Sequence, residues 1–274
     1  MFHHPSATSA LAPIGVALLM LARADAPSRE PTASSLEVRY VANAGVFVRI
    51  GDARVLIDAP IREGIPPYAT SSPEERVRLE RAAAPYDTVD AILVTHWHED
   101  HFSPEAVAAH LSHNTRAVLV SSPEVVERVR AVAPGLPAGR FRGVLPEPGG
   151  SQLVRVGTLP IRVLRVRHSP GRRLPEQHVG FLVGEDPAVL HTGDADPTAG
   201  NFALLRGLPR VRLALLPFWY LLNDASRRFV RESIAPDRIV AMHLPPQDAD
   251  DVTRAFAGGN VDATLLVAPG TVVR

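Results

Sequence analysis

The opening third of the chain contains short runs in which apolar and polar positions alternate. Three of them, residues 36–42, 45–50 and 54–58, follow one another closely, and a Gly-Asp pair separates the last two. A period of two is typical of strands with one buried face, and the Gly-Asp pair favours a tight turn. These runs predict an antiparallel meander, followed by a polar loop and a helix over residues 73–84.

From residue 90 onward, short apolar runs alternate with longer stretches of helical composition. The runs predict strands over residues 91–95, 117–121, 211–216, 238–242 and 263–267. Between them, a second series of closely spaced strands is predicted over residues 152–156, 161–167, 179–183 and 188–192. The order is therefore strands followed by β/α units, repeated once. Such a succession predicts an α/β fold in which two sheets pack together with helices outside.

Three predicted helices share the opening Ser-Pro-Glu. Their serines are Ser72, Ser103 and Ser122. An N-cap serine accepts a hydrogen bond from the first turn, and proline suits the first helical position. The glutamate that follows offsets the helix dipole. We therefore expect a helix to begin directly after each of these serines.

The N-terminus has the features of an export signal. Residues 10–22 form an apolar run too short to span a bilayer, and a small-residue Ala-Asp-Ala sequence ends at Ala26. We expect a signal peptide over residues 1–26, a linker over 27–35, and a periplasmic or secreted mature protein without a membrane anchor. Because no Lys or Arg precedes the apolar run, a cytoplasmic protein with a misassigned start or a buried N-terminal helix is the alternative.

Charge and cysteine content narrow the function classes. The 29 basic residues balance the 29 acidic residues, so no global field attracts nucleic acid, and a small-molecule substrate is expected. The chain has no cysteine. Disulfides, thiolate metal sites and cysteine nucleophiles are thereby excluded, and any metal must be held by His, Asp or Glu.

The clearest chemical signal lies directly after the apolar strand over residues 91–94. The sequence Thr-His-Trp-His-Glu-Asp-His places His96, His98, Asp100 and His101 within six positions. The first two imidazoles lie two residues apart and share a face in extended backbone, whereas the last two residues turn past the strand end. Imidazole combined with carboxylate favours Zn²⁺, Mn²⁺ or Fe over Mg²⁺ or Ca²⁺. The pattern predicts a metal site rather than a solvated, His-rich turn.

A strand followed by His-x-His-x-Asp-His resembles the metallo-β-lactamase superfamily. The resemblance extends over residues 36–270, and it points to the uncharacterised hydrolases of that superfamily rather than to a named enzyme. It implies a four-layer αβ/βα sandwich of two mixed sheets with helices on the outer faces, formed by a single domain over residues 36–274.

The same resemblance implies three further ligands, each at the end of a predicted strand. They are His168, Asp194 and His243. One ion would be held by His96, His98 and His168. The second would be held by Asp100, His101 and His243, with Asp194 bridging the two.

The resemblance implies a binuclear hydrolase, with zinc as the expected metal and Mn²⁺ or Fe as alternatives. Two bridged ions share a water whose pKa falls to near neutral, and the resulting hydroxide attacks an ester, lactone, amide or phosphodiester bond. Asp100 and Asp194 are the expected catalytic residues. The sequence contains no Gly-x-Ser-x-Gly nucleophile elbow.

Several other polar or aromatic residues are candidates for the surroundings of the site. His178 competes with His168 as a ligand, but it enters a strand rather than leaving one and is expected beside the site. His191 is interpreted as structural. Asp58 ends a strand, where it either orients a ligand histidine or forms a turn.

The candidates for the substrate pocket are aromatic and basic. They are Trp219 and Tyr220, in the sequence Pro-Phe-Trp-Tyr, and Arg172 with its neighbour Arg173. The aromatic residues are expected to wall the cleft, with the Tyr220 hydroxyl facing substrate, or to pack under a loop. The arginines would face an anionic substrate or lie in a solvated loop.

Two other functions fit the same scaffold. A di-iron oxidoreductase is one, although such proteins usually carry an additional flavin domain. A metal-binding protein without turnover is the other, and the complete ligand set argues against it. The motif does not select β-lactams, because Asp100 beside His101 is common to the whole superfamily.

Overall fold

A computed structural model describes residues 1–3, 35–171 and 174–274. It separates into two units, Met1–Thr32 and Ala33–Arg274, and every helix and strand lies in the second. Apart from residues 1–3, the predicted signal peptide lies outside the described residues, as does most of the linker, so export stays a prediction. Among the helices of the described residues, none is long and apolar enough to cross a membrane.

The first sheet has seven strands in the order β14-β1-β2-β3-β4-β5-β6. Their bounds are β1 Leu36–Ala42, β2 Gly45–Ile50, β3 Ala53–Ile57, β4 Ala91–Val94, β5 Val118–Ser121, β6 Phe141–Gly143 and β14 Val272–Val273. The expected meander is confirmed, because β1, β2 and β3 pair antiparallel. From β3 to β6 the pairing is parallel, as helical crossovers require.

The second sheet has seven strands in the order β13-β12-β11-β10-β9-β8-β7. Their bounds are β7 Ser151–Val156, β8 Leu159–Arg165, β9 Val179–Val183, β10 Ala188–His191, β11 Val211–Pro217, β12 Arg238–Met242 and β13 Thr264–Leu265. Antiparallel pairing from β7 to β10 gives way to parallel pairing from β10 to β13. The two halves therefore repeat one plan, as the order of predicted strands indicated.

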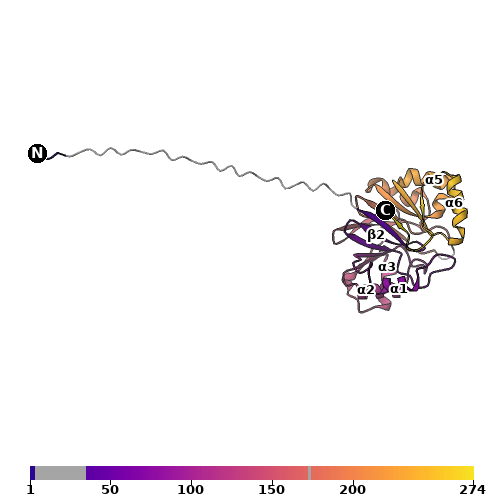
Figure 1. Cartoon of the computed structure of the whole chain (residues 1–274), viewed down its shortest axis with the longest axis horizontal. Helices are drawn as coiled ribbons and strands as arrows, with labels where there is room; N and C mark the ends of the chain where they lie inside the picture. Colours follow the sequence, from indigo (N-terminus) through magenta and orange to yellow (C-terminus); the bar gives the residue numbers. More distant parts are fainter. Residues whose placement is uncertain (4–34, 172–173) are drawn as a thin grey trace. The chain divides into compact units, whose positions relative to one another are not determined.

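The helices cover the outer faces of the two sheets. They are α1 Pro73–Glu80, α2 Pro104–His113, α3 Pro123–Val132, α4 Ala199–Phe202, α5 Asp224–Phe229 and α6 Ala249–Gly258, with shorter helical turns η1 Ala138–Arg140, η2 Ala203–Gly207, η3 Phe218–Leu221, η4 Val230–Ile234 and η5 Pro246–Asp248. Helices α1, α2 and α3 lie together on one side of the folded unit, and α5 and α6 lie on the other (Figure 1).

Three apolar clusters hold these layers together. One lies between the sheets, where Val48 of β2 and Phe181 of β9 are both fully buried. The others lie between each sheet and its helices, around Leu111 of α2 and around Phe256 of α6. This is the expected four-layer αβ/βα sandwich.

The expected helix starts are confirmed. The hydroxyl oxygens of Ser72, Ser103 and Ser122 each accept a hydrogen bond from a backbone N–H three residues later, at 3.2, 3.4 and 3.4 Å. Helix α1 ends at Glu80 rather than at residue 84, because Ala82 adopts a left-handed conformation with φ of 46°.

Strand β8 also ends earlier than predicted, at Arg165. The side chain of Asn201 hydrogen-bonds to both polar groups of the Arg167 backbone. It accepts from the Arg167 N–H at 2.8 Å and donates to the Arg167 carbonyl at 2.9 Å. The chain therefore leaves the sheet before His168, which forms an isolated bridge with Ala195 instead.

Candidate metal centre

The candidate ligands leave the carboxyl ends of four strands. The motif with His96 follows β4, His168 follows β8, Asp194 follows β10 and His243 follows β12. The carboxyl ends of strands are the usual place for a site in sheets with parallel strands. All seven candidate ligands have donor atoms in one of two compact groups.

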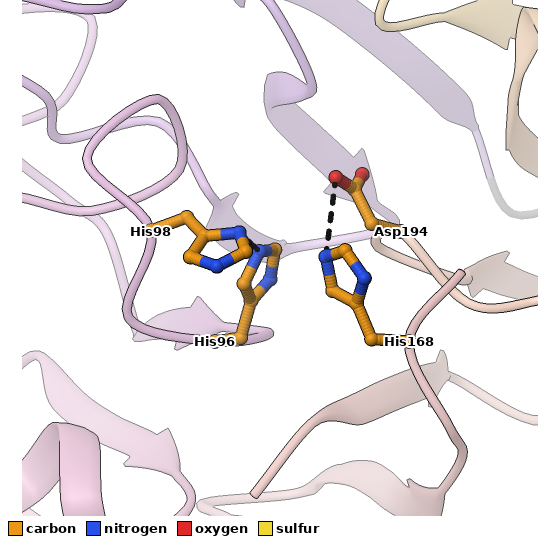
Figure 2. Close-up of side chains that lie close together, drawn as sticks. All are labelled: His96, His98, His168 and Asp194. Carbon is orange, nitrogen blue, oxygen red and sulfur yellow. Dashed lines mark hydrogen bonds and ion pairs between the residues drawn. The ribbon is translucent and has the colours of Figure 1, made fainter. Parts of the chain in front are cut away.

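The first group contains His96, His98, His168 and Asp194, whose donor atoms lie within 4.8 Å of one another. Nε2 of His96 is 2.8 Å from Nδ1 of His98, and Nε2 of His168 is 3.6 Å from Oδ2 of Asp194. Figure 2 shows the three imidazoles turned toward a common space, with the carboxylate of Asp194 above His168.

The second group contains Asp100, His101 and His243, all of them buried. Nε2 of His101 lies 3.2 Å from Nε2 of His243 and 3.6 Å from Oδ2 of Asp100. Oδ2 of Asp100 also lies 3.3 Å from Nε2 of His243. Three donor atoms from two distant parts of the chain thus converge.

Asp194 contacts both groups. Its Oδ2 is 3.3 Å from Nε2 of His243, and its Oδ1 is 3.3 Å from Nε2 of His101. The same Oδ2 atom also approaches His168 in the first group. The carboxylate of Asp194 therefore lies where a bridging ligand would lie.

The loop that presents Asp194 is fixed by tight packing. Gly193 has a positive φ of 53°, and a Cβ atom there would lie 2.7 Å from the Thr95 side chain and 2.9 Å from Nε2 of His178. The Asp194 carbonyl accepts a hydrogen bond from the Ser169 N–H at 2.7 Å. This bond holds the His168 loop beside Asp194.

Asp58 lies behind the candidate ligands and contacts two of them, one directly and one through Thr95. Its Oδ2 accepts from Nδ1 of His101 at 2.9 Å and from the Thr95 hydroxyl at 2.7 Å. Thr95 Oγ1 lies 3.0 Å from Nδ1 of His96. One buried carboxylate thus fixes a histidine of each group, leaving both Nε2 atoms to face the site.

Asn43 contacts the site but was not among the residues predicted from the sequence. Its side-chain amide donates to Oδ2 of Asp100 at 2.9 Å, and its backbone carbonyl accepts from the His243 N–H at 3.2 Å. It adopts φ of 43°, a conformation that asparagine tolerates better than most residues. An asparagine at a strand end was the available signal, although nothing in the sequence tied it to the motif.

The competing histidines have structural partners. His178 lies beside the site, and its Nε2 accepts from the Asp194 N–H at 3.2 Å, so it positions the proposed bridge. His191 has Nε2 at 2.9 Å from the Ala44 carbonyl oxygen, and its Nδ1 accepts from the Gly193 N–H at 3.1 Å. Neither belongs to a group of donor atoms.

The acidic and basic groups of the cluster shift one another's pKa values toward the charged forms. Burial would raise the pKa of Asp100, but His101 and His243 outweigh it and lower that pKa to about 2. Burial acts against charge on His243 as well, yet the carboxylates of Asp194 and Asp100 raise its pKa to about 9. The two carboxylates therefore stay ionised and attract positive charge into the site.

The arrangement of the donor atoms suits binding of metal ions better than hydrogen bonding among the donor atoms themselves. Nε2 of His168 and Oδ1 of Asp194 are buried without a hydrogen bond to any described residue. The Nε2 atoms of His101 and His243 face each other, although two neutral imidazole nitrogens in this position need a cation or a proton between them. Nitrogen and carboxylate donors in two adjoining groups could hold two ions.

An open cavity of about 530 Å³ reaches the site, and Trp219 lines it as expected. Tyr68 also lines it and was missed, because an isolated tyrosine in a proline-rich loop carries no signal. The expectation that Tyr220 offers a hydroxyl to substrate is wrong. Tyr220 is fully buried, and its hydroxyl donates to the Ala195 carbonyl at 2.6 Å. Arg172 lies outside the described residues.

The chain is similar to proteins described as metal-dependent hydrolases. A protein of Archaeoglobus fulgidus described as a UPF0173 metal-dependent hydrolase is 24% identical over 234 residues, covering 80% of this chain and 93% of the relative. A protein of Hyperthermus butylicus with the same description is 28% identical over 238 residues, covering 84% and 95%.

The fold has solved counterparts as well. The structure of Igni18, described as a novel metallo hydrolase from Ignicoccus hospitalis, is similar with a TM-score of 0.59 at 20% identity, covering 87% of this chain and 97% of that one. Residues 53–266, well over half of the chain, match the family described as the beta-lactamase superfamily domain. The chain therefore belongs to the beta-lactamase superfamily.

Proposed function

We propose that this protein is a metal-dependent hydrolase whose site holds two divalent ions. One would be held by His96, His98 and His168, the other by Asp100, His101 and His243, with Asp194 shared. Zinc is the proposed metal, with Mn²⁺ or Fe as alternatives that the same donors accept.

One observation carries this proposal, the position of the Asp194 carboxylate. Its Oδ2 lies 3.6 Å from Nε2 of His168 in the first group and 3.3 Å from Nε2 of His243 in the second. A carboxylate that reaches both groups supports a pair of ions rather than two separate sites. The relatives described as metal-dependent hydrolases support metal-dependent hydrolysis.

The chemistry divides between the ions and the chain. Two divalent ions held there would supply Lewis acidity and would lower the pKa of a bound water to near neutral. Asp100 and Asp194 provide the carboxylate oxygens that can hold the attacking water by its hydrogens. Asp58 and Asn43 keep His101 and Asp100 in place, so the groups need little rearrangement on reaction. The bond attacked is an ester, lactone, amide or phosphodiester.

The experiment combines metal loading with a substrate panel. The purified protein is stripped with a chelator, reloaded with Zn²⁺, Mn²⁺ or Fe²⁺, and assayed on esters, lactones, amides, phosphodiesters and β-lactams. We expect turnover of at least one class that the chelator abolishes and the metal restores. Asp194→Ala should abolish it, whereas His113→Ala, at an exposed histidine of α2, should not.

Two results would contradict the proposal. One is two bound ions without turnover of any substrate class. The other is iron-dependent consumption of oxygen with no hydrolysis, which would indicate the oxidoreductase alternative.

A further inference from the structure

The cavity beside the site is lined by aromatic and apolar residues together with polar ones, among them Ser169, Asn223 and Ser226. Its apolar lining consists of Tyr68, Pro170, Pro197, Trp219 and Leu222. His168, Asp194 and His243 reach into the same cavity, so a molecule in it meets donor atoms of both groups. A pocket of about 530 Å³ is in the range that holds small organic ligands.

The rings of Tyr68 and Trp219 both pack against His243, a candidate metal ligand. The Tyr68 ring stands edge-on to the imidazole of His243, with centroids 4.5 Å apart at 79°. The Trp219 ring does the same, at 5.1 Å and 73°. Edge-to-face contacts hold aromatic rings in position. Apolar surface is thus placed directly beside the proposed metal centre.

One apolar side chain of the cavity lining is also exposed. Leu222 is 40% exposed. Together with Tyr68, Pro170, Pro197 and Trp219 it gives the cavity an apolar wall, which is typical of a pocket that binds apolar ligands.

The charges around the centre favour an uncharged ligand. Asp58, Asp100 and Asp194 touch the histidines of the site, and the Asp196 side chain lines the cavity. These four carboxylates match the four positive charges of two divalent ions. None of the described residues that line this cavity is an arginine, and the chain has no lysine. Arg165 and Arg167 line the adjoining cavity, which shares His168, Pro170 and Asp196 with this one.

We propose, on the basis of the proposed hydrolase function, that the substrate is an uncharged carboxylic ester or lactone with an apolar acyl group of several carbons. The acyl group lies against Tyr68, Trp219 and Leu222, and the carbonyl lies at the metal centre. Water adds to the carbonyl carbon and the bond to the alkoxy oxygen breaks. The acid keeps the oxygen from water, and the alcohol oxygen takes a proton.

The first test is a series of methyl esters from acetate to octanoate, assayed by acid release so that the leaving group stays constant. We expect kcat/KM to rise about fourfold per methylene until the cavity is filled, equivalent to about 0.8 kcal/mol each. Bis(4-nitrophenyl) phosphate should be a poorer substrate than octanoate ester. A flat series, or preference for the phosphodiester, would overturn the proposal.

Variants separate the rings from the rest of the site. Tyr68→Ala and Trp219→Ala should lose at least tenfold in kcat/KM on octanoate ester but much less on acetate. Tyr68→Phe keeps the ring and should keep the chain-length dependence. Leu153→Ala, at an exposed leucine of β7, is the control for losing apolar surface elsewhere. Equal losses on both esters would contradict an acyl pocket.

The second test measures binding without turnover. The chain has two tryptophans, so Trp97→Phe leaves Trp219 as the only tryptophan, which is excited selectively over the tyrosines. Titration of this variant with octanamide should change the emission saturably, at concentrations where acetamide has no effect. No saturable change would overturn the acyl pocket. Octanamide binding in a protein that hydrolyses nothing would instead contradict the hydrolase function, so the two failures are distinguishable.

Discussion

Oδ2 of Asp58 lies 2.9 Å from Nδ1 of His101, and both side chains are fully buried. The pair fixes the imidazole so that Nε2 faces Asp194 and Asp100. Asp58 also reaches His96 through the Thr95 hydroxyl. Both proposed ion sites therefore depend on one buried carboxylate that is not itself a candidate ligand.

Asp58→Asn should weaken metal binding by about 10–100-fold, as loss of such supporting partners does elsewhere. The amide keeps the shape of the carboxylate but lacks its charge and one acceptor oxygen. Competition with a chromophoric chelator measures the affinity. Asp90→Asn is the matched control, since Asp90 accepts from the Arg54 N–H at the opposite end of β4. An unchanged affinity in Asp58→Asn would show that Asp58 forms only a turn.

Asn43→Gly should lower metal affinity at the group of Asp100 and His243. Glycine tolerates the positive φ of 43° but removes the amide that donates to Oδ2 of Asp100. Asn260→Gly is the control, because Asn260 is exposed and has φ of 50°. Calorimetric titration of both variants with Zn²⁺ checks this. Equal affinities would mean that the Asn43 amide does not support the site.

Gly193→Ala should destabilise the fold more than Gly157→Ala does. Both glycines have positive φ, 53° and 57°, which costs alanine about 1–2 kcal/mol. Only at Gly193 would the new methyl group also meet Thr95 and His178, which adds about 1–3 kcal/mol of overpacking. Urea unfolding gives both free energies. Similar losses in the two variants would contradict the close packing described for this loop.

His110 should make stability depend on pH. It is buried in α2 with Nδ1 at 2.6 Å from the Leu79 carbonyl oxygen, and burial lowers its pKa from 6.5 to about 4. The unfolded chain then binds more protons than the folded chain between these values. Its contribution is complete above pH 6.5 and is lost as the pH falls toward 4, by up to about 3 kcal/mol.

The measurement is the free energy of unfolding at pH 7 and pH 4.5, made with a chelator present. His110→Phe should show a smaller loss on acidification than the wild type. His113→Phe, on the exposed side of the same helix, is the control for the substitution itself. Identical pH dependence in wild type and His110→Phe would show that His110 does not cause the loss of stability at low pH.

The sequence predicted the elements whose cause is local. Alternating runs near the start and short apolar runs further on predicted most strands to within a residue or two, and three Ser-Pro-Glu sequences predicted the starts of α1, α2 and α3. Strands β6 and β14 were missed, because three and two residues are too short to show a period. The early end of β8 depends on Asn201, which lies 34 residues from Arg167.

The residues of the site likewise fall into those that the sequence could predict and those that it could not. The motif at His96 is visible because its residues are adjacent, and the resemblance to a known superfamily located His168, Asp194 and His243, which the structure brings together. Asn43 and Tyr68 could not be placed, because their roles arise only from contacts across the fold. The two alternatives for Tyr220, facing the substrate or packing under a loop, could not be separated, because a Phe-Trp-Tyr run does not reveal which ring faces the core; the structure buries Tyr220.

The central claim, two ions that share Asp194, is tested most directly by metal stoichiometry. Stripped protein is reloaded with Zn²⁺, desalted, and analysed for zinc per chain in wild type, Asp194→Asn and His113→Ala. We expect two ions in wild type and in His113→Ala. Asp194→Asn keeps the shape but removes the shared charge, so it should retain less than one. Two ions held by Asp194→Asn with wild-type affinity, or one ion in the wild type, would contradict the shared site.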